Sequence, residues 1–228
     1  MTIDFADFTK ASNLVHAIQG AALLLLGAAE AYAADNKGRK VMLAAAVALT
    51  ASGAAMFLAV LALPGGWSLE QLGAALGVRR GFYLFIAFAC VFSAAGLSRL
   101  TQEALGREGG GWRALFLALL AFAGVLYFTM AWRVNEEAWR QVLVWHAAMG
   151  ATLLLAVAAR TAHIFFPRRA LSVAWAALLM ITGLQLLTYR EAQGAFAPRL
   201  VTMQTAPELP APAPLKNAKP ADKKRPAR

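Results

Sequence analysis

The stretch LVHAIQGAALLLLGAAE, residues 14–30, decides the fold class. It is apolar on all sides, with a histidine near its start, as in a helix surrounded by lipid or by other helices. A helix needs about 20 mostly apolar residues to cross a membrane, because its backbone must satisfy its own hydrogen bonds there. The stretch therefore predicts a transmembrane helix that carries a histidine.

The rest of the chain has the same character. Its 228 residues are 60% hydrophobic and only 15% charged, whereas soluble domains have about 25% charged residues. No apolar run alternates with period two, as a membrane barrel strand would. The sequence predicts an all-α, polytopic membrane protein whose residues 1–196 form one bundle. Its six expected transmembrane helices are residues 12–34, 40–63, 81–99, 113–132, 141–165 and 169–188.

Two segments outside these spans differ in character. Residues 68–80, SLEQLGAALGVRR, are too short and polar to span, and Ser68 and Gln71 have capping-box spacing, so we expect a short interfacial helix. Residues 197–228 are rich in Pro, Ala and Lys and predict a disordered tail. Much of the net charge of +10 lies in this tail, without a basic face interleaved with aromatics, so we expect no nucleic-acid partner. The expected partners are the lipid bilayer and other membrane subunits.

The location expected from this pattern is a cell membrane, specifically a bacterial inner membrane. Six spans put both termini on one side, and basic residues in the short loops are divided almost evenly between the sides. The basic tail shifts the balance towards cytoplasmic termini. A second interpretation remains open for residues 1–34, because AEAYAAD contains an A-x-A pattern like a signal-peptide cleavage site, although the preceding residues lack the positive start.

The opening stretch has a counterpart 130 residues later, in VWHAAMGATLLLAVAAR, residues 144–160. We interpret the hairpin 12–63 as repeated at 141–188, an arrangement that often frames a central site in membrane proteins. Chance in a low-complexity sequence is the alternative. The informative matches at this offset are His16 with His146, Gly20 with Gly150, Arg39 with Arg169 and Gly53 with Gly183.

The paired histidines predict a cofactor site. Both helices cross the membrane in the same direction, so His16 and His146 should lie at similar depth, where a polar side chain is costly and indicates function. We expect them to be the two axial ligands of a b-type haem held between the first and fifth spans. Gly20 and Gly150, one turn further on, would let the macrocycle approach the backbone. The alternative is that these are interfacial histidines and ordinary helix-packing glycines.

A second polar set is expected near the opposite membrane face. Glu30 and Arg160 occupy matched positions of the repeat, and His163 follows Arg160 by one turn. They could lock the hairpins together or carry protons. The alternative is that the charges reach the headgroups separately.

These observations predict a membrane electron-transfer subunit rather than an independent enzyme. No metalloprotease, serine-hydrolase or phosphate-loop motif is present in the sequence. The single Cys90 excludes an internal disulfide and is interpreted as a small packing residue. The alternatives are a non-catalytic scaffold or assembly subunit of a larger complex, and a small-solute transporter.

Residues 13–20, NLVHAIQG, resemble the first helix of heliorhodopsins. The resemblance covers about one helix. It implies a seven-helix protein with retinal bound to a lysine of the last helix. This chain departs from that pattern, because its last lysine before the tail is Lys40, in a loop, and no span offers a Schiff-base site.

Overall fold

The computed structural model describes residues 4–36, 38–106, 110–192 and 194–197, and six of its helices are long and apolar enough to cross a membrane. This confirms the predicted all-α, six-span fold and a multi-pass membrane protein. The predicted tail, residues 197–228, lies outside the described residues apart from Ala197. The six helices are α1 (Phe5–Asp35), α2 (Arg39–Ala62), α4 (Tyr83–Leu105), α5 (Gly110–Thr129), α6 (Glu136–Phe165) and α7 (Arg169–Thr188).

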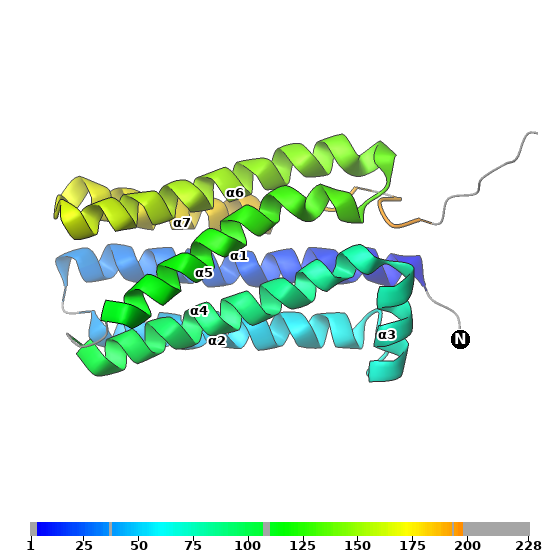
Figure 1. The fold of residues 1–228 in the computed structure, drawn as a ribbon, viewed down its shortest axis with the longest axis horizontal. Helices are drawn as coiled ribbons and strands as arrows, with labels where there is room; N and C mark the ends of the chain where they lie inside the picture. The colour runs from blue at the N-terminus through cyan, green and yellow to red at the C-terminus, as the bar shows by residue number, and fades with distance from the viewer. Residues whose placement is uncertain (1–3, 37, 107–109, 193, 198–228) are drawn as a thin grey trace, which may run out of the picture. The chain divides into compact units, whose positions relative to one another are not determined.

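The predicted interfacial helix is present as α3 (Leu69–Val78), which lies across the other helices at the end where the chain begins (Figure 1). Its cap is the predicted one, because the Ser68 hydroxyl accepts a hydrogen bond from the backbone N–H of Gln71 at 3.3 Å. Two short 3-10 turns, Arg80–Phe82 and Met130–Arg133, complete the described helical elements.

Helix α1 begins seven residues earlier than expected, at Phe5 rather than at residue 12. The Asp4 carboxylate accepts a hydrogen bond from the N–H of Ala6, which satisfies one free donor at the helix start. Phe8 has no exposed surface and anchors these two added turns to the bundle. The hydropathy pattern missed them because Asp7 and Lys10 interrupt their apolar residues.

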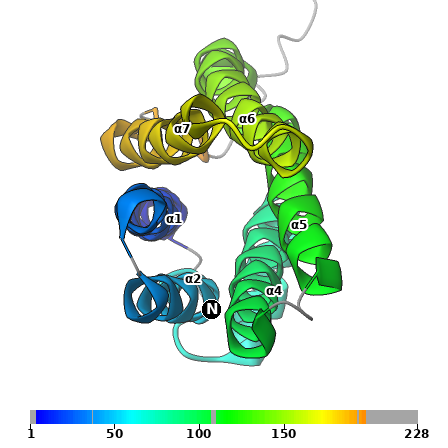
Figure 2. The same cartoon turned by 90° about the vertical axis from the view of Figure 1, so that its left-hand side faces the viewer.

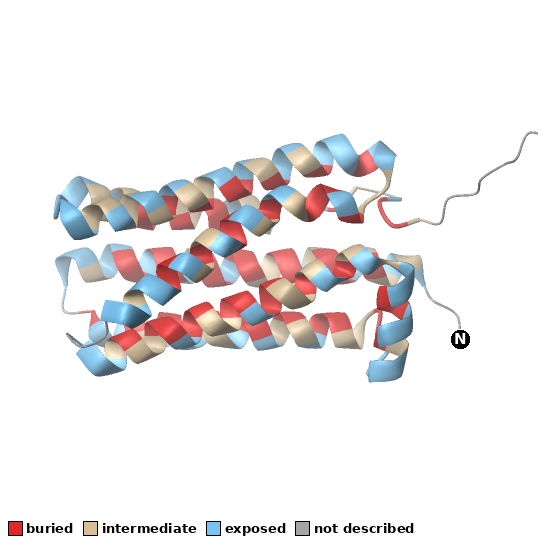
Figure 3. Cartoon of the chain, viewed as in Figure 1, coloured by how far each residue is buried: buried red, intermediate tan, exposed pale blue. Residues whose placement is uncertain are grey.

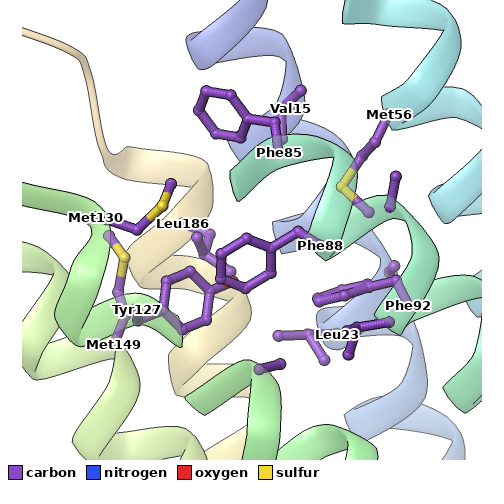
Figure 4. Packing of buried hydrophobic residues seen from close by; sticks show 14 of the residues in the cluster. Val15, Leu23, Met56, Phe85, Phe88, Phe92, Tyr127, Met130, Met149 and Leu186 are labelled. Carbon is purple, nitrogen blue, oxygen red and sulfur yellow. The ribbon is translucent and has the colours of Figure 1, made fainter. Parts of the chain in front are cut away.

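The six helices form a closed ring, in which each packs against two neighbours in the order α1, α2, α4, α5, α6, α7 and back to α1 (Figure 2). The buried faces point into the ring (Figure 3). Phe85, Phe88 and Phe92 of α4 and Tyr127 of α5 fill its middle, all with 0% exposure (Figure 4). Side chains therefore pack the interior of the ring in this layer.

The outer surface of the ring is apolar. Leu25, Val47, Phe122 and Leu155 are each more than half exposed, as residues that contact lipid chains would be. Cys90 is also exposed, so its interpretation as a small packing residue is wrong. A small side chain in an apolar run can lie on the lipid-facing or on the interior face of a membrane helix, and the sequence pattern does not distinguish the two.

Candidate functional site

His16 and His146 meet inside the ring. They come from α1 and α6, which are the two neighbours of α7 in the ring (Figure 2). Their Nε2 atoms lie 3.1 Å apart and neither residue has exposed surface. Each lies ten or eleven residues into a helix that begins at Phe5 or Glu136, about 15 Å along its axis. The structure thus brings the sequence-predicted pair together at matched depth.

The backbone fixes the protonation of the outer nitrogens. Nδ1 of His16 lies 2.6 Å from the carbonyl oxygen of Ser12, and Nδ1 of His146 lies 2.8 Å from that of Val142. Because a carbonyl only accepts, both Nδ1 atoms carry hydrogen and donate. In neutral imidazoles both Nε2 atoms are then unprotonated, and their lone pairs face each other. Such an arrangement is repulsive unless a cation, either a proton or a metal ion, lies between them.

Aromatic rings enclose the pair. The ring of Tyr189, just after α7, lies 4.7 Å from that of His16 and 4.8 Å from that of His146, centroid to centroid. Phe85 packs edge-on against His16 at 5.8 Å, and Tyr127 lies 6.2 Å from His146. These contacts hold the imidazoles in place and keep water from them.

A buried amide lies beside this layer. Gln19, one turn after His16, has no exposed surface, and its Oε1 accepts a hydrogen bond from the Tyr127 hydroxyl at 3.2 Å. Its Nε2 has no hydrogen-bond partner among the described residues. A buried polar atom without a partner is costly, and such atoms concentrate at sites that bind something.

A buried ion pair supports His16 from the side of the termini. The side chains of Arg133 and Glu191 have 0% exposure and lie 2.6 Å apart. The Ser12 hydroxyl donates to Glu191 at 2.6 Å and accepts from Arg133 at 3.2 Å, and the Tyr189 hydroxyl donates to Glu191 at 2.9 Å. Because Ser12 also offers its carbonyl to His16, this network fixes the orientation of that imidazole.

The network keeps Glu191 ionised. Burial by itself would raise the pKa of the Glu191 carboxyl, but the Arg133 guanidinium and the hydroxyls of Ser12 and Tyr189 hold that pKa below its usual value. Burial also raises the pKa of the Tyr189 phenol, which therefore stays a neutral donor. The pair Arg133–Glu191 is neutral as a whole, so neither side chain is free to ligate a metal.

The separation of the two Nε2 atoms suits one metal ion. Metal–nitrogen bonds of about 2.0–2.1 Å to a shared ion would meet at roughly 100° across 3.1 Å. The ring centroids lie 5.3 Å apart, so the two Nε2 atoms face each other nearly head-on, and both imidazoles would have to turn to aim at such an ion. Nδ1–H donated to a carbonyl is the usual support of a ligating histidine. Within the described residues no third histidine, cysteine or carboxylate joins the pair. Met149, buried one turn after His146, offers a thioether nearby.

Axial ligation of a haem asks for more room than these side chains leave. Ligands on opposite faces of one iron lie about 4 Å apart, with the macrocycle between them. Here the imidazoles touch each other directly, and Tyr189 and Phe85 pack against them. A single ion would therefore require less movement of these side chains than a macrocycle would, and haem b stays a prediction.

The role expected for the two glycines is not what their surroundings show. A Cβ on Gly20 would come within 2.7 Å of the carbonyl oxygen of Gly183 on α7, and one on Gly150 within 2.6 Å of that of Gly124 on α5. Both glycines therefore allow neighbouring helices to approach closely, which was the alternative interpretation. Neither position leaves a slot beside its histidine, because helix backbone occupies the space.

The second polar set assembles at the opposite end of the bundle. Glu30 lies 3.7 Å from Arg160, but its closer partner is Arg99 of α4, at 2.8 Å. His163 lies along the same pocket, with Nδ1 3.1 Å from the carbonyl oxygen of Arg168. The residues of the predicted cluster thus lie together in one pocket, which also contains Arg99.

The sequence-based predictions did not include the four residues that support His16, which are Ser12, Arg133, Tyr189 and Glu191. The last three follow span ends in the sequence, where charged and aromatic residues are normally exposed. One local signal existed, because Ser12 precedes His16 by one helical turn. Ser12 and Glu191 lie 179 residues apart, and no pattern within the chain indicated that they meet.

Comparison with known proteins finds no matching family model, curated protein or solved structure. The likeness of residues 13–20 to heliorhodopsins gains no support from the interior of the ring. Lys10 and Lys40, the lysines among the described residues, are both exposed, and Lys40 lies in the first turn of α2 rather than in a loop.

Proposed function

We propose that this protein is a membrane electron-transfer subunit in which His16 and His146 hold one redox-active metal ion. The observation that carries the proposal is the facing of two Nε2 lone pairs at 3.1 Å while both Nδ1 atoms donate to carbonyls. A cation bound between the rings would remove the repulsion between these lone pairs. Imidazole ligands suit copper and iron, both of which change oxidation state by one electron.

Enclosure of the pair favours electron transfer over catalysis or transport. Neither histidine has exposed surface, and aromatic rings close the site, so a substrate has no direct contact with it. An electron needs no such opening. A metal ion held by these two histidines would supply one-electron exchange between a reduced and an oxidised partner subunit. Packing of the ring interior by Phe88, Phe92 and Tyr127 likewise speaks against a solute path in this layer.

Haem b is the second candidate for the metal centre. It is favoured by two anchored imidazoles that point at one another from different helices. It requires α1 and α6 to separate by about 1 Å at this level, and the rings around the pair to clear a slot. Tyr189 is the residue that would have to move furthest, because it contacts both imidazoles.

Metal content and absorption of the purified protein test the proposal. We expect about one copper or iron per chain by elemental analysis, retained in His163→Ala and lost in His16→Ala and His146→Ala. A Soret band that disappears in the same two variants would identify the iron as haem. His163 is the matched control, because it lies at the far end of the bundle. Well-folded wild type without metal, or equal metal in wild type and His146→Ala, would contradict the proposal.

The expected setting is a bacterial inner membrane, with the termini in the cytoplasm and other redox subunits as neighbours. What supports it is the basic tail and the apolar outer face. Accessibility of a cysteine introduced at each loop, with Cys90 replaced by Ser, measures the orientation. Labelling of the termini from the periplasm would overturn this placement.

A further inference from the structure

A charged pocket opens at the end of the bundle opposite the histidines. It encloses about 900 Å³ between the end of α1, the start of α2, the ends of α4 and α6, and the start of α7. In a membrane this end lies at the headgroup level of the other face. The charged side chains along the pocket are Glu30, Arg39, Arg99, Glu103, Arg160 and Arg169.

Both carboxylates of this pocket form ion pairs with Arg99. Arg99, whose side chain is 5% exposed, lies 2.8 Å from Glu30 and 3.1 Å from Glu103. It also donates to Gln102 at 2.7 Å. Arg99 therefore takes the closest contacts of both acidic side chains, and little negative charge is left for the other guanidiniums.

Positive charge is in excess around the pocket. Arg160 reaches Glu30 only at 3.7 Å, and Arg39 has no ion pair among the described residues. Arg169 is paired at 2.9 Å with Asp35, a residue that does not line the pocket. Arg99 and Arg113 both lie within electrostatic range of Arg160. The buried Nε atoms of Arg99 and Arg113 have no hydrogen-bond partner in the described part of the chain.

We infer that this pocket binds a phosphate group through Arg39 and Arg160. Guanidinium groups match phosphate oxygens with paired hydrogen bonds and are the preferred residues for this ligand at partly dry sites. A phosphate would offset the surplus charge that the two glutamates leave. The pocket is larger than one phosphate, so the group belongs to a larger molecule, either an anionic lipid headgroup or a soluble phosphate compound.

Two measurements separate these sources. Inorganic phosphate and pyrophosphate are titrated into delipidated protein in neutral detergent while the melting temperature is followed. In parallel, the protein is placed in nanodiscs of phosphatidylcholine with or without phosphatidylglycerol, and bound lipid is counted by native mass spectrometry. Stabilisation by the soluble anions indicates a soluble ligand. Retention of phosphatidylglycerol without a response to soluble anions indicates a lipid. A bound phosphate compound stabilises the fold according to its concentration and affinity.

The variants are Arg39→Gln and Arg160→Gln, with Arg190→Gln as the control. Arg190 lies at the other end of the bundle, and its hydrogen bonds within the described part of the chain go to backbone carbonyls. We expect binding to weaken at least tenfold in the first two variants and to stay unchanged in the control. Arg39→Gln decides the matter if Arg160→Gln is unstable, because Arg39 has no ion pair with any residue that the structure describes. Equal binding in wild type and Arg39→Gln, or no response to either probe, would overturn the inference.

Discussion

The two ends of the ring differ in how completely their charged side chains are buried. Around the histidines, Arg133 and Glu191 have 0% side-chain exposure, and their polar neighbours are joined in one network. Around the arginine pocket, Arg99 and Glu30 form a pair that is 5% exposed on each side, but Arg169 and Asp35 pair with 75% and 57% of their side chains exposed. Arg160 reaches Glu30 only at 3.7 Å. Both ends sit in the same bundle, so burial, not composition, decides what each can do. The enclosed end holds a fixed geometry, and the open end is available to a ligand.

The largest effect should come from breaking the enclosed ion pair. Glu191→Gln leaves the Arg133 guanidinium buried without its counter-charge, which costs about 3–5 kcal/mol in such settings. Unfolding in mixed micelles with increasing denaturing detergent measures the loss. A change below 1 kcal/mol would mean that water reaches Arg133 and that this end is not enclosed.

A smaller loss is expected from the hydroxyl that bridges the pair. Ser12→Ala removes the donor to Glu191 and the acceptor of Arg133 but keeps the carbonyl that holds His16. Glu191 keeps Arg133 and Tyr189 as partners, so the expected loss is that of hydrogen bonds to charged groups, about 1.5–3 kcal/mol. The same unfolding assay measures it, with Thr152→Ala as the control, since that exposed hydroxyl donates to the carbonyl of Ala148 in its own helix. Equal losses in both variants would contradict the bridging role.

Acid should weaken the enclosed end first. The folded pKa of Glu191 lies below its unfolded value of about 4.3. Its contribution is therefore complete above that value and is lost as the pH falls through the folded pKa, with a slope of at most about 1.4 kcal/mol per pH unit. Stability followed from pH 7 to pH 3 should show this loss in wild type and a flatter curve in Glu191→Gln. Identical curves would assign the acid response to other carboxylates.

The smallest effect should come from the exposed pair at the open end. Asp35→Asn breaks a contact with Arg169 at 2.9 Å, but solvent screens both groups, and such pairs contribute about 0.2–1 kcal/mol. The same unfolding assay, run beside Glu191→Gln, measures the contrast between the ends. A loss as large as that of Glu191→Gln would remove the distinction drawn between them.

Sequence pattern predicted the spans and the pair of histidines, because both depend on local composition and on one internal offset. It did not predict contacts that depend on which helices become neighbours. Glu30 lies closer to Arg99 than to Arg160, because α4 also lines this pocket. Gly20 allows α1 to pack closely against α7, a contact that the sequence pattern did not indicate. The homology of the α1–α2 and α6–α7 hairpins stays a prediction.

The most direct test of the histidine pair is X-ray absorption at the metal edge of the purified protein. The account predicts a copper or iron ion with two imidazole nitrogens at about 2.0–2.1 Å, in wild type and in His163→Ala alike. An ion without imidazole neighbours, or a spectrum unchanged by His16→Ala, would contradict it.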